Sequence, residues 1–528
     1  MIRAMIIAIV TGIISTIMKY FGYKTIVVVL TIVTAIFLFL LLVARLDLGL
    51  IRYFDADELA YLHWAHNVFI GKLPYIDFFF YVPAGFIWVL APMFLFVKGS
   101  AILSVSRMAA FIIFVLMGLV CGLLLRRIRR PTNMLESLWV LLLPATILAF
   151  LPLPADKMLE MRPDNIATVV AFVGLYLQVR WLESQNKVFG WWSGIAYGIS
   201  LLLLPKTLPQ IAVAIVVSLF AARMFTKKLS QLVTFILGMG TPLFLFGIWI
   251  LMVSRNVNDI QLIVYSLTQL PLEVNKIGQL FPMQPDLFFY PNNNYYGIGG
   301  WSRGLVANHI VWIIGLFFGV YRLLTPWIGG KNKIGAWIEL LVAGSFLAYI
   351  VMFIYGYPLR HAQYLIPIAV FVAFYVGDMI WSIWNSISSS LWGKRAFVVL
   401  YIFCIVLMWG ISNTVNLPKR LWTNAEDFRT LEFALQTIPQ DSYVLDLVGA
   451  TIYFQDPAYG CCLPLGQYTQ FLSRPINVLS DGLQDTKPMY VYQGRLFRLH
   501  DITSKDRQYI EANYKPLTAD KTWLIRKY

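Results

Sequence analysis

Three acidic residues stand within four positions, directly after the first long apolar run of the sequence. They are Asp55, Asp57 and Glu58, and the apolar run before them ends near residues 45–47. Carboxylates are costly near hydrocarbon, so acids at the mouth of a membrane helix are candidates for a functional site. The alternative is a solvated loop in which Asp57 caps the following helix, because an Asp side chain accepts hydrogen bonds from free backbone N–H groups there. Both interpretations remain open on these residues alone.

A second acidic position follows at Asp164, directly after Arg162 and Pro163, where the pattern predicts the start of another helix. Asp164 could be a charge that the helix dipole stabilises, or a second functional carboxylate. Lys206 lies between two prolines at a predicted helix turn. Its side chain could reach lipid headgroups, which is the simpler interpretation, or bind a substrate phosphate.

Further candidates occur at predicted outer positions later in the chain. Arg360 and His361 stand at the start of an outer helix, and Arg303 lies in a long polar loop. Arginine suits phosphate because its planar fork donates two parallel hydrogen bonds. Tyr81 ends an aromatic run that is typical of a membrane-interface belt, although such rings can also stack on a sugar or line an isoprenoid groove.

The composition predicts that these candidate residues belong to a polytopic membrane protein, whose helices position them. Of 528 residues, 59% are hydrophobic and 13% are charged, and the mean hydropathy is +0.69, which is too apolar for a water-soluble core. The net charge of +15 comes from short basic clusters between apolar runs. The positive-inside rule explains such clusters, so nucleic acid is not an expected partner.

About eleven apolar runs are long enough to cross a bilayer. The four arginines within 126–130 belong in the cytoplasm, which places residues 83–98 on the outer surface instead of across the membrane. Residues 4–18 predict an interfacial or re-entrant helix. The loops 46–100 and 254–308 then lie outside. The expected spans are 25–45, 101–125, 134–153, 165–182, 188–204, 207–222, 230–253, 309–324, 335–356, 361–384 and 396–413.

From residue 416 the composition becomes mixed polar. Helices are predicted near 424–438 and 501–514, and strands at 443–448, 489–492 and 523–526. The expected fold is therefore an all-α polytopic membrane domain, residues 1–415, followed by a small soluble α/β domain, residues 416–528. The number of spans places this second domain on the extracytoplasmic side of the inner membrane.

The order of these motifs resembles the polyprenyl-phosphate-dependent glycosyltransferases of the GT-C superfamily, and within it the protein mannosyltransferase and aminoarabinose transferase group. The motifs are the Asp57-Glu58 pair, Gly-Lys-Leu-Pro-Tyr-Ile-Asp at 71–77, Pro-Ala-Gly at 83–85, and Arg-Pro-Asp at 162–164. The likeness covers roughly the first 210 residues, and the rest by architecture only. One departure is Tyr-Val at 81–82, where the aminoarabinose branch has a lysine just before the proline.

The resemblance implies an enzyme that passes a sugar from a lipid phosphate carrier to a glycan, lipid or protein acceptor at the outer face. It assigns catalytic roles to Asp57, Glu58 and Asp164. Direct displacement at the anomeric carbon needs a base for the acceptor and charge stabilisation for the departing phosphate, and it inverts the configuration. Candidates for binding phosphate or substrate are Arg162, Lys206, Arg303, Arg360, His361 and Tyr81. No cofactor is assigned, and a divalent cation (Mg²⁺ or Mn²⁺) shared by Asp57 and Asp164 is left open.

The competing interpretation is a transporter or flippase of lipid-linked sugars. It predicts charges in the middle of spans, or broken helices there. In the spans 101–125, 134–153, 230–253 and 396–413 the charged residues lie toward the ends. This distribution favours the enzyme.

Overall fold

The computed structural model describes residues 22–152, 155–221, 228–276, 310–328, 333–357, 361–387, 390–460, 462, 471–474, 479–494 and 502–527. The helix predicted at 4–18, Arg303 and Arg360 lie outside these residues.

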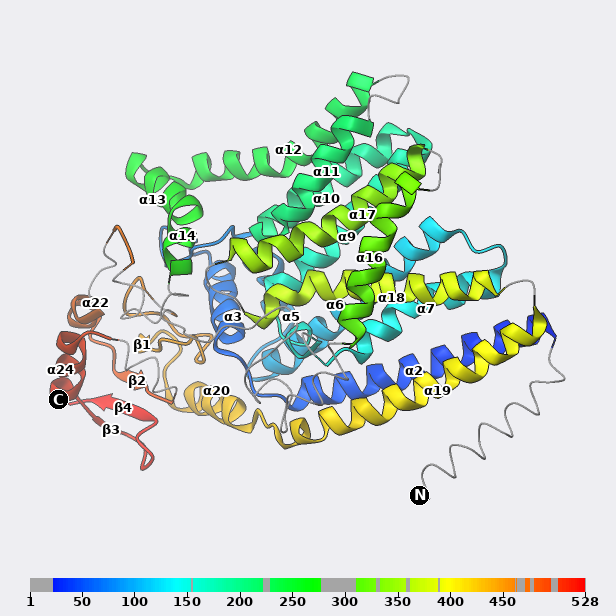
Figure 1. The fold of residues 1–528 in the computed structure, drawn as a ribbon. Helices are drawn as coiled ribbons and strands as arrows, with labels where there is room; N and C mark the ends of the chain where they lie inside the picture. The colour runs from blue at the N-terminus through cyan, green and yellow to red at the C-terminus, as the bar shows by residue number, and fades with distance from the viewer. Residues whose placement is uncertain are drawn as a thin grey trace, which may run out of the picture.

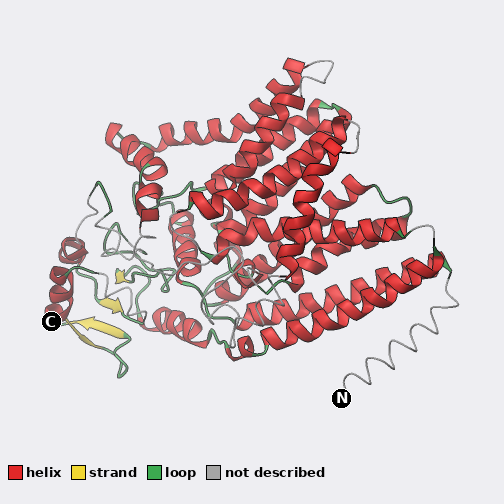
Figure 2. Cartoon of the chain, in the orientation of Figure 1, coloured by secondary structure: helices red, strands yellow, loops and turns green. Residues whose placement is uncertain are grey.

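A bundle of long apolar helices forms most of the molecule (Figure 1, Figure 2). Each of the eleven predicted spans coincides with a helix, and the chain is a multi-pass membrane protein. Among the described residues seven helices are long and apolar enough to cross a membrane, and shorter apolar helices accompany them. The bundle helices are α2 (Tyr23–Ile51), α6 (Ala101–Arg129), α7 (Met134–Phe150), α9 (Pro163–Ser184), α10 (Lys187–Leu203), α11 (Leu208–Ala221), α12 (Lys228–Val253), α16 (Ile310–Ile328), α17 (Lys333–Val351), α18 (Ile366–Ser386) and α19 (Leu391–Asn416).

Short elements connect the bundle helices at the end where the acidic residues lie. Residues 83–98 form two helices of six and four residues, which are too short to cross a bilayer about 30 Å thick. The first of them begins at Gly85, which packs against α10. A Cβ at this position would lie 2.5 Å from the Leu202 carbonyl oxygen, so the close approach requires glycine. The short elements are α3 (Ala56–Phe69), α4 (Gly85–Leu90), α5 (Met93–Phe96), α8 (Ala155–Met158), η1 (Pro205–Thr207), α13 (Val257–Thr268), α14 (Leu270–Asn275), the π-helix η5 (Met352–Gly356), η6 (Ala362–Leu365) and η7 (Pro418–Leu421).

Helix α3 starts with a capping box, and its N-cap is Asp55 rather than Asp57. The Asp55 side chain accepts a hydrogen bond from the backbone N–H of Asp57, and Glu58 accepts one from the backbone N–H of Asp55. The capping interpretation of Asp57 is therefore wrong. Because Asp55 caps the helix, the Asp57 carboxylate is left for other contacts. The helix ends before Gly71, whose φ of +88° suits glycine.

Buried ion pairs hold the opposite end of the bundle. Arg129 Nε donates to Asp378 Oδ1 over 2.6 Å and Arg129 Nη1 donates to Glu339 Oε1 over 2.5 Å. Arg322 Nε donates to Asp378 Oδ2 over 2.8 Å. These contacts join α6, α16, α17 and α18. This end carries the basic cluster that the positive-inside rule assigns to the cytoplasm.

The C-terminal part of the chain is a small α/β unit. Its sheet has the order β1-β2-β4-β3, with β1 parallel to β2 and the other pairs antiparallel. The two helices and three strands predicted from the sequence are present, and the prediction missed α22 and β3. The elements are α20 (Ala425–Thr437), β1 (Val444–Leu445), α22 (Leu479–Thr486), β2 (Tyr490–Tyr492), α24 (Ser504–Asn513), β3 (Tyr514–Pro516) and β4 (Trp523–Arg526).

This unit lies beyond the end of the bundle that carries α3, as Figure 1 shows. Its apolar side chains share one buried cluster with the segment between α2 and α6. Leu59 and Trp64 of α3 and Phe86 of α4 belong to the same cluster as Leu431 and Val448. The C-terminal unit is therefore packed directly on α3.

Candidate active site

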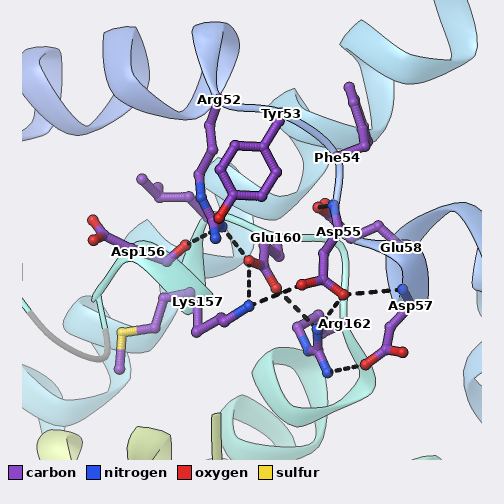
Figure 3. A network of polar contacts seen from close by, with 12 residues as sticks. Arg52, Tyr53, Phe54, Asp55, Asp57, Glu58, Asp156, Lys157, Glu160 and Arg162 are labelled. Carbon is purple, nitrogen blue, oxygen red and sulfur yellow. Dashed lines mark hydrogen bonds and ion pairs between the residues drawn. The ribbon is translucent and has the colours of Figure 1, made fainter. Parts of the chain in front are cut away.

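Acids and bases from loops far apart in the sequence meet at one end of the bundle (Figure 3). Residues 52–58 run from the turn after α2 into the first turn of α3, and residues 156–164 run from α8 into the first turn of α9. The sequence placed both groups at the outer face, and the structure brings them into one network.

Asp57 and Arg162 form the most exposed pair of this network. Arg162 Nη2 donates to Asp57 Oδ2 over 2.6 Å. The Arg162 side chain is only 5% exposed, whereas that of Asp57 is 46% exposed. Arg162 Nη1 also donates to Glu160 Oε2 over 3.0 Å, which anchors the guanidinium from behind. The Asp57 carboxylate is thus held in place and open to a ligand.

Glu58, its neighbour, is fully buried and faces the protein. One oxygen accepts from Arg107 Nη2 of α6 over 2.8 Å, and the other accepts from the backbone N–H of Met161 over 2.8 Å. Burial raises the pKa of Glu58 to about 7. These contacts fix α3 against α6 and against the segment between α8 and α9, so the geometry suits a positioning residue better than a residue that touches substrate.

Glu160 is the fully buried centre of the network. It pairs with Arg52, with Lys157 over 2.9 Å and with Arg162 over 3.0 Å. Burial by itself would raise the pKa of Glu160, but Arg52 and Lys157 hold it at about 2. Lys157 also donates to Asp55 over 3.1 Å. Glu160 therefore keeps its charge and organises the cations around it.

Asp164 lies in the first turn of α9 and is 6% exposed. Lys206 Nζ donates to Asp164 Oδ1 over 3.2 Å and lies 3.6 Å from the centre of the Tyr364 ring. Lys206 thus contacts both Asp164 and the Tyr364 ring. The two residues border a small pocket whose other lining residues are Thr168, Leu204, Thr207, Tyr349, Tyr357, Gln363, Tyr364 and Pro367.

His361 reaches the same site from η6. Burial lowers the pKa of His361 to about 4, although the Asp57 charge acts in the opposite direction. His361 is therefore neutral near pH 7 and can exchange hydrogen bonds there without adding a positive charge. Tyr81 packs against Phe79, with the two ring centres 5.9 Å apart.

Several network residues were missed by the sequence analysis. Arg107 lies near the start of the predicted span 101–125, and an arginine inside a span is a signal that could have been used. Arg52 stands just before the acids. Arg45 and Lys419 both pair with Asp156, and nothing local in the sequence connects them.

A cation shared by Asp57 and Asp164 does not fit this arrangement. Arg162 binds Asp57, and its Nε lies 3.9 Å from Asp164 Oδ2, so a guanidinium stands between the two carboxylates. In the part of the chain that the structure describes, no group of three or more His, Cys, Asp or Glu residues is placed to hold a metal ion.

No protein-family model and no curated protein matches the chain. Among solved structures, it is similar to the oligosaccharyltransferase of Archaeoglobus fulgidus, tethered with an acceptor peptide, at 12% identity and a TM-score of 0.52, over 91% of this chain and 72% of that one. It is also similar to ArnT of Cupriavidus metallidurans, bound to undecaprenyl phosphate, at 10% identity and a TM-score of 0.51, over 96% and 98% of the two chains. The chain has the GT-C fold. The GT-C resemblance predicted from the sequence is thus confirmed for the fold. The structural similarity covers 96% of this chain and so includes the C-terminal unit.

Proposed function

We propose that this chain is an integral membrane glycosyltransferase that moves a sugar from a polyprenyl-phosphate carrier to an acceptor. The observation that carries the proposal is the open carboxylate of Asp57, held by the buried Arg162 on a GT-C fold. One solved structure with this fold holds undecaprenyl phosphate and another holds an acceptor peptide. A lipid-phosphate donor is consistent with both.

The chemistry follows from the position of Asp57. The acceptor hydroxyl oxygen forms a bond to the anomeric carbon while the bond from that carbon to the phosphate oxygen breaks. Asp57 takes the hydroxyl proton, and the phosphate leaves with the bonding electron pair. Because phosphate is a weak base it needs no strong acid, and displacement from the opposite side inverts the configuration.

Charge stabilisation of the departing phosphate is the second requirement. Arg162 and Lys206 are the described cations beside Asp57 and Asp164, and His361 offers a neutral ring nitrogen. Asp164 orients Lys206 in this proposal. Arg303 and Arg360 remain proposed phosphate ligands. Tyr81 remains a proposed part of a substrate groove.

The proposed site and the C-terminal unit face the extracytoplasmic side of the inner membrane. The support is the basic cluster at the other end of the bundle, where Arg129 and Arg322 lie. The acceptor is a glycan, a lipid or a protein, and the transporter interpretation is not favoured.

The test is a transfer assay with the full chain in nanodiscs and a panel of radiolabelled polyprenyl-phosphate sugars. We expect wild type to consume one donor and Asp57→Asn to be slower by about 10²- to 10⁴-fold, the usual contribution of a general base. Asp47→Asn, an exposed acid at the end of α2, is the matched control and should keep full activity. Full turnover by Asp57→Asn would refute the assignment.

A further inference from the structure

His63 of α3 binds two groups of the C-terminal unit, Asp456 and the Ile452 carbonyl, and we call these contacts the clamp. His63 Nε2 lies 2.8 Å from Asp456 Oδ2, and His63 Nδ1 lies 2.9 Å from the Ile452 carbonyl oxygen. Both of these partners are acceptors, and the Asn67 amide nitrogen also lies 3.1 Å from Nε2 and donates to Asp456 Oδ2 over 3.4 Å. Burial by itself would lower the pKa of His63, but the Asp456 carboxylate raises it above its ordinary value, which favours the charged imidazole. The His63 and Asp456 side chains are 2% and 10% exposed. A charge-assisted pair with so little solvent contact is stronger than a surface pair.

The loop that supplies Asp456 is tied by internal hydrogen bonds and touches the backbone of α3. The Asp446 carboxylate accepts hydrogen bonds from the backbone N–H groups of Val448, Gly449 and Thr451, over 2.8 to 3.1 Å. Gly449 has φ +75°, and a Cβ there would lie 3.0 Å from His63 Cβ and 3.1 Å from the Ala60 Cα atom. The loop thus approaches α3 as closely as a glycine allows.

Aromatic contacts extend the same interface by one turn of α3. The Tyr453 ring centre lies 5.0 Å from that of His66, and the Tyr453 hydroxyl donates to the Gly99 carbonyl oxygen over 2.9 Å. His63 and His66 therefore serve packing between the two parts of the chain. All ten residues from Glu58 to Asn67 are buried, so α3 has no solvated face along this stretch.

Two buried ion pairs thus fix α3 from different sides. Glu58–Arg107 ties its first turn to the membrane helix α6, and His63–Asp456 ties its middle to the C-terminal unit. Asp57 lies in the same first turn. We propose that the C-terminal unit is a working part of the active site, in which the His63–Asp456 pair positions α3 and so aims the Asp57 carboxylate.

This inference rests on the proposed function. His63 and Asp456 are positioning residues, because they act on the reacting groups only through α3. A displacement of about 1 Å in a reacting group can cost about 10²-fold in rate. Loss of the clamp should therefore lower kcat by about 10- to 100-fold while the KM for the donor stays unchanged.

The experiment compares wild type, Asp456→Asn and the control Asp441→Asn, an exposed acid of the same unit, all as full chains in nanodiscs. Amide hydrogen exchange is followed in peptides that cover residues 56–70, and kcat and KM are measured with the donor that wild type consumes. We expect at least tenfold faster exchange and a lower kcat in Asp456→Asn only. His63→Gln keeps one amide donor toward Asp456, should give intermediate values, and replaces Asp456→Asn if that variant fails to fold.

Unchanged exchange across α3 in the folded variant would overturn the inference whatever the activity. Faster exchange with an unchanged kcat would overturn it as well, because α3 would then loosen without consequence for Asp57. If wild type consumes no donor, the proposed function fails instead, and the exchange data alone decide whether the clamp exists.

Discussion

Replacement of Glu160 by Gln is predicted to destabilise the fold by about 3 kcal/mol. The pKa of the fully buried Glu160 lies at about 2 instead of 4.5, and this difference corresponds to about 3 kcal/mol. Breaking a buried pair by removing one partner costs about 3–5 kcal/mol, which agrees. The variant leaves Arg52, Lys157 and Arg162 without their common acid.

The assay is reversible unfolding in mixed micelles, with Glu511→Gln, an exposed acid of α24, as the matched control. The control should change the free energy of unfolding by less than about 0.5 kcal/mol. Because the folded-state pKa of Glu160 is lowered, its contribution is fully present above pH 4.5 and is lost as the pH falls toward about 2. The difference between wild type and variant should therefore be constant from pH 5.5 to about 8 and shrink in acid.

Equal stability of wild type and Glu160→Gln at pH 7 would refute this reasoning. A difference that grows on acidification would also refute it, since the sign of the pKa shift would then be wrong.

Two further substitutions test the site and the bundle. Lys206→Gln removes the positive charge beside Asp164 and should weaken binding of polyprenyl phosphate by about 10- to 100-fold, the usual contribution of a charged hydrogen bond. The affinity is measured by competition with labelled carrier, and an unchanged affinity would exclude Lys206 as a phosphate ligand. Asp378→Asn removes the carboxylate that Arg129 and Arg322 share, and it should lower the free energy of unfolding in mixed micelles by about 3–5 kcal/mol. An unchanged free energy of unfolding would show that these arginines find other partners.

The sequence predicted the bundle because long apolar runs and basic clusters are local signals. It also selected Asp57 and Asp164, since each acid opens a helix next to apolar sequence. The error about the N-cap was avoidable. Asp55 and Glu58 have the three-residue spacing of a capping box, and this pattern already assigns the cap to Asp55.

The partners of these acids depend on tertiary structure and could not be predicted. Arg107 follows Glu58 by 49 residues, and Asp456 follows His63 by 393 residues. Helix α22 was missed because Leu479–Thr486 contains glycine and two aspartates, which favour turns. Strand β3 has three residues, one of them proline, and its pairing with β4 is what defines it.

The ion pairs at the end of the bundle opposite α3 also constrain the order in which the protein can be built. Arg129 is synthesised 210 residues before Glu339 and 249 residues before Asp378. At about 5–20 residues per second, the ribosome needs roughly 10–50 s to supply the second acid. Throughout that interval the Arg129 charge at the end of α6 depends on water or lipid headgroups for its solvation. The complete network can form only after α18 has emerged, so a chain truncated before Asp378 leaves Arg129 with Glu339 and without its second acid.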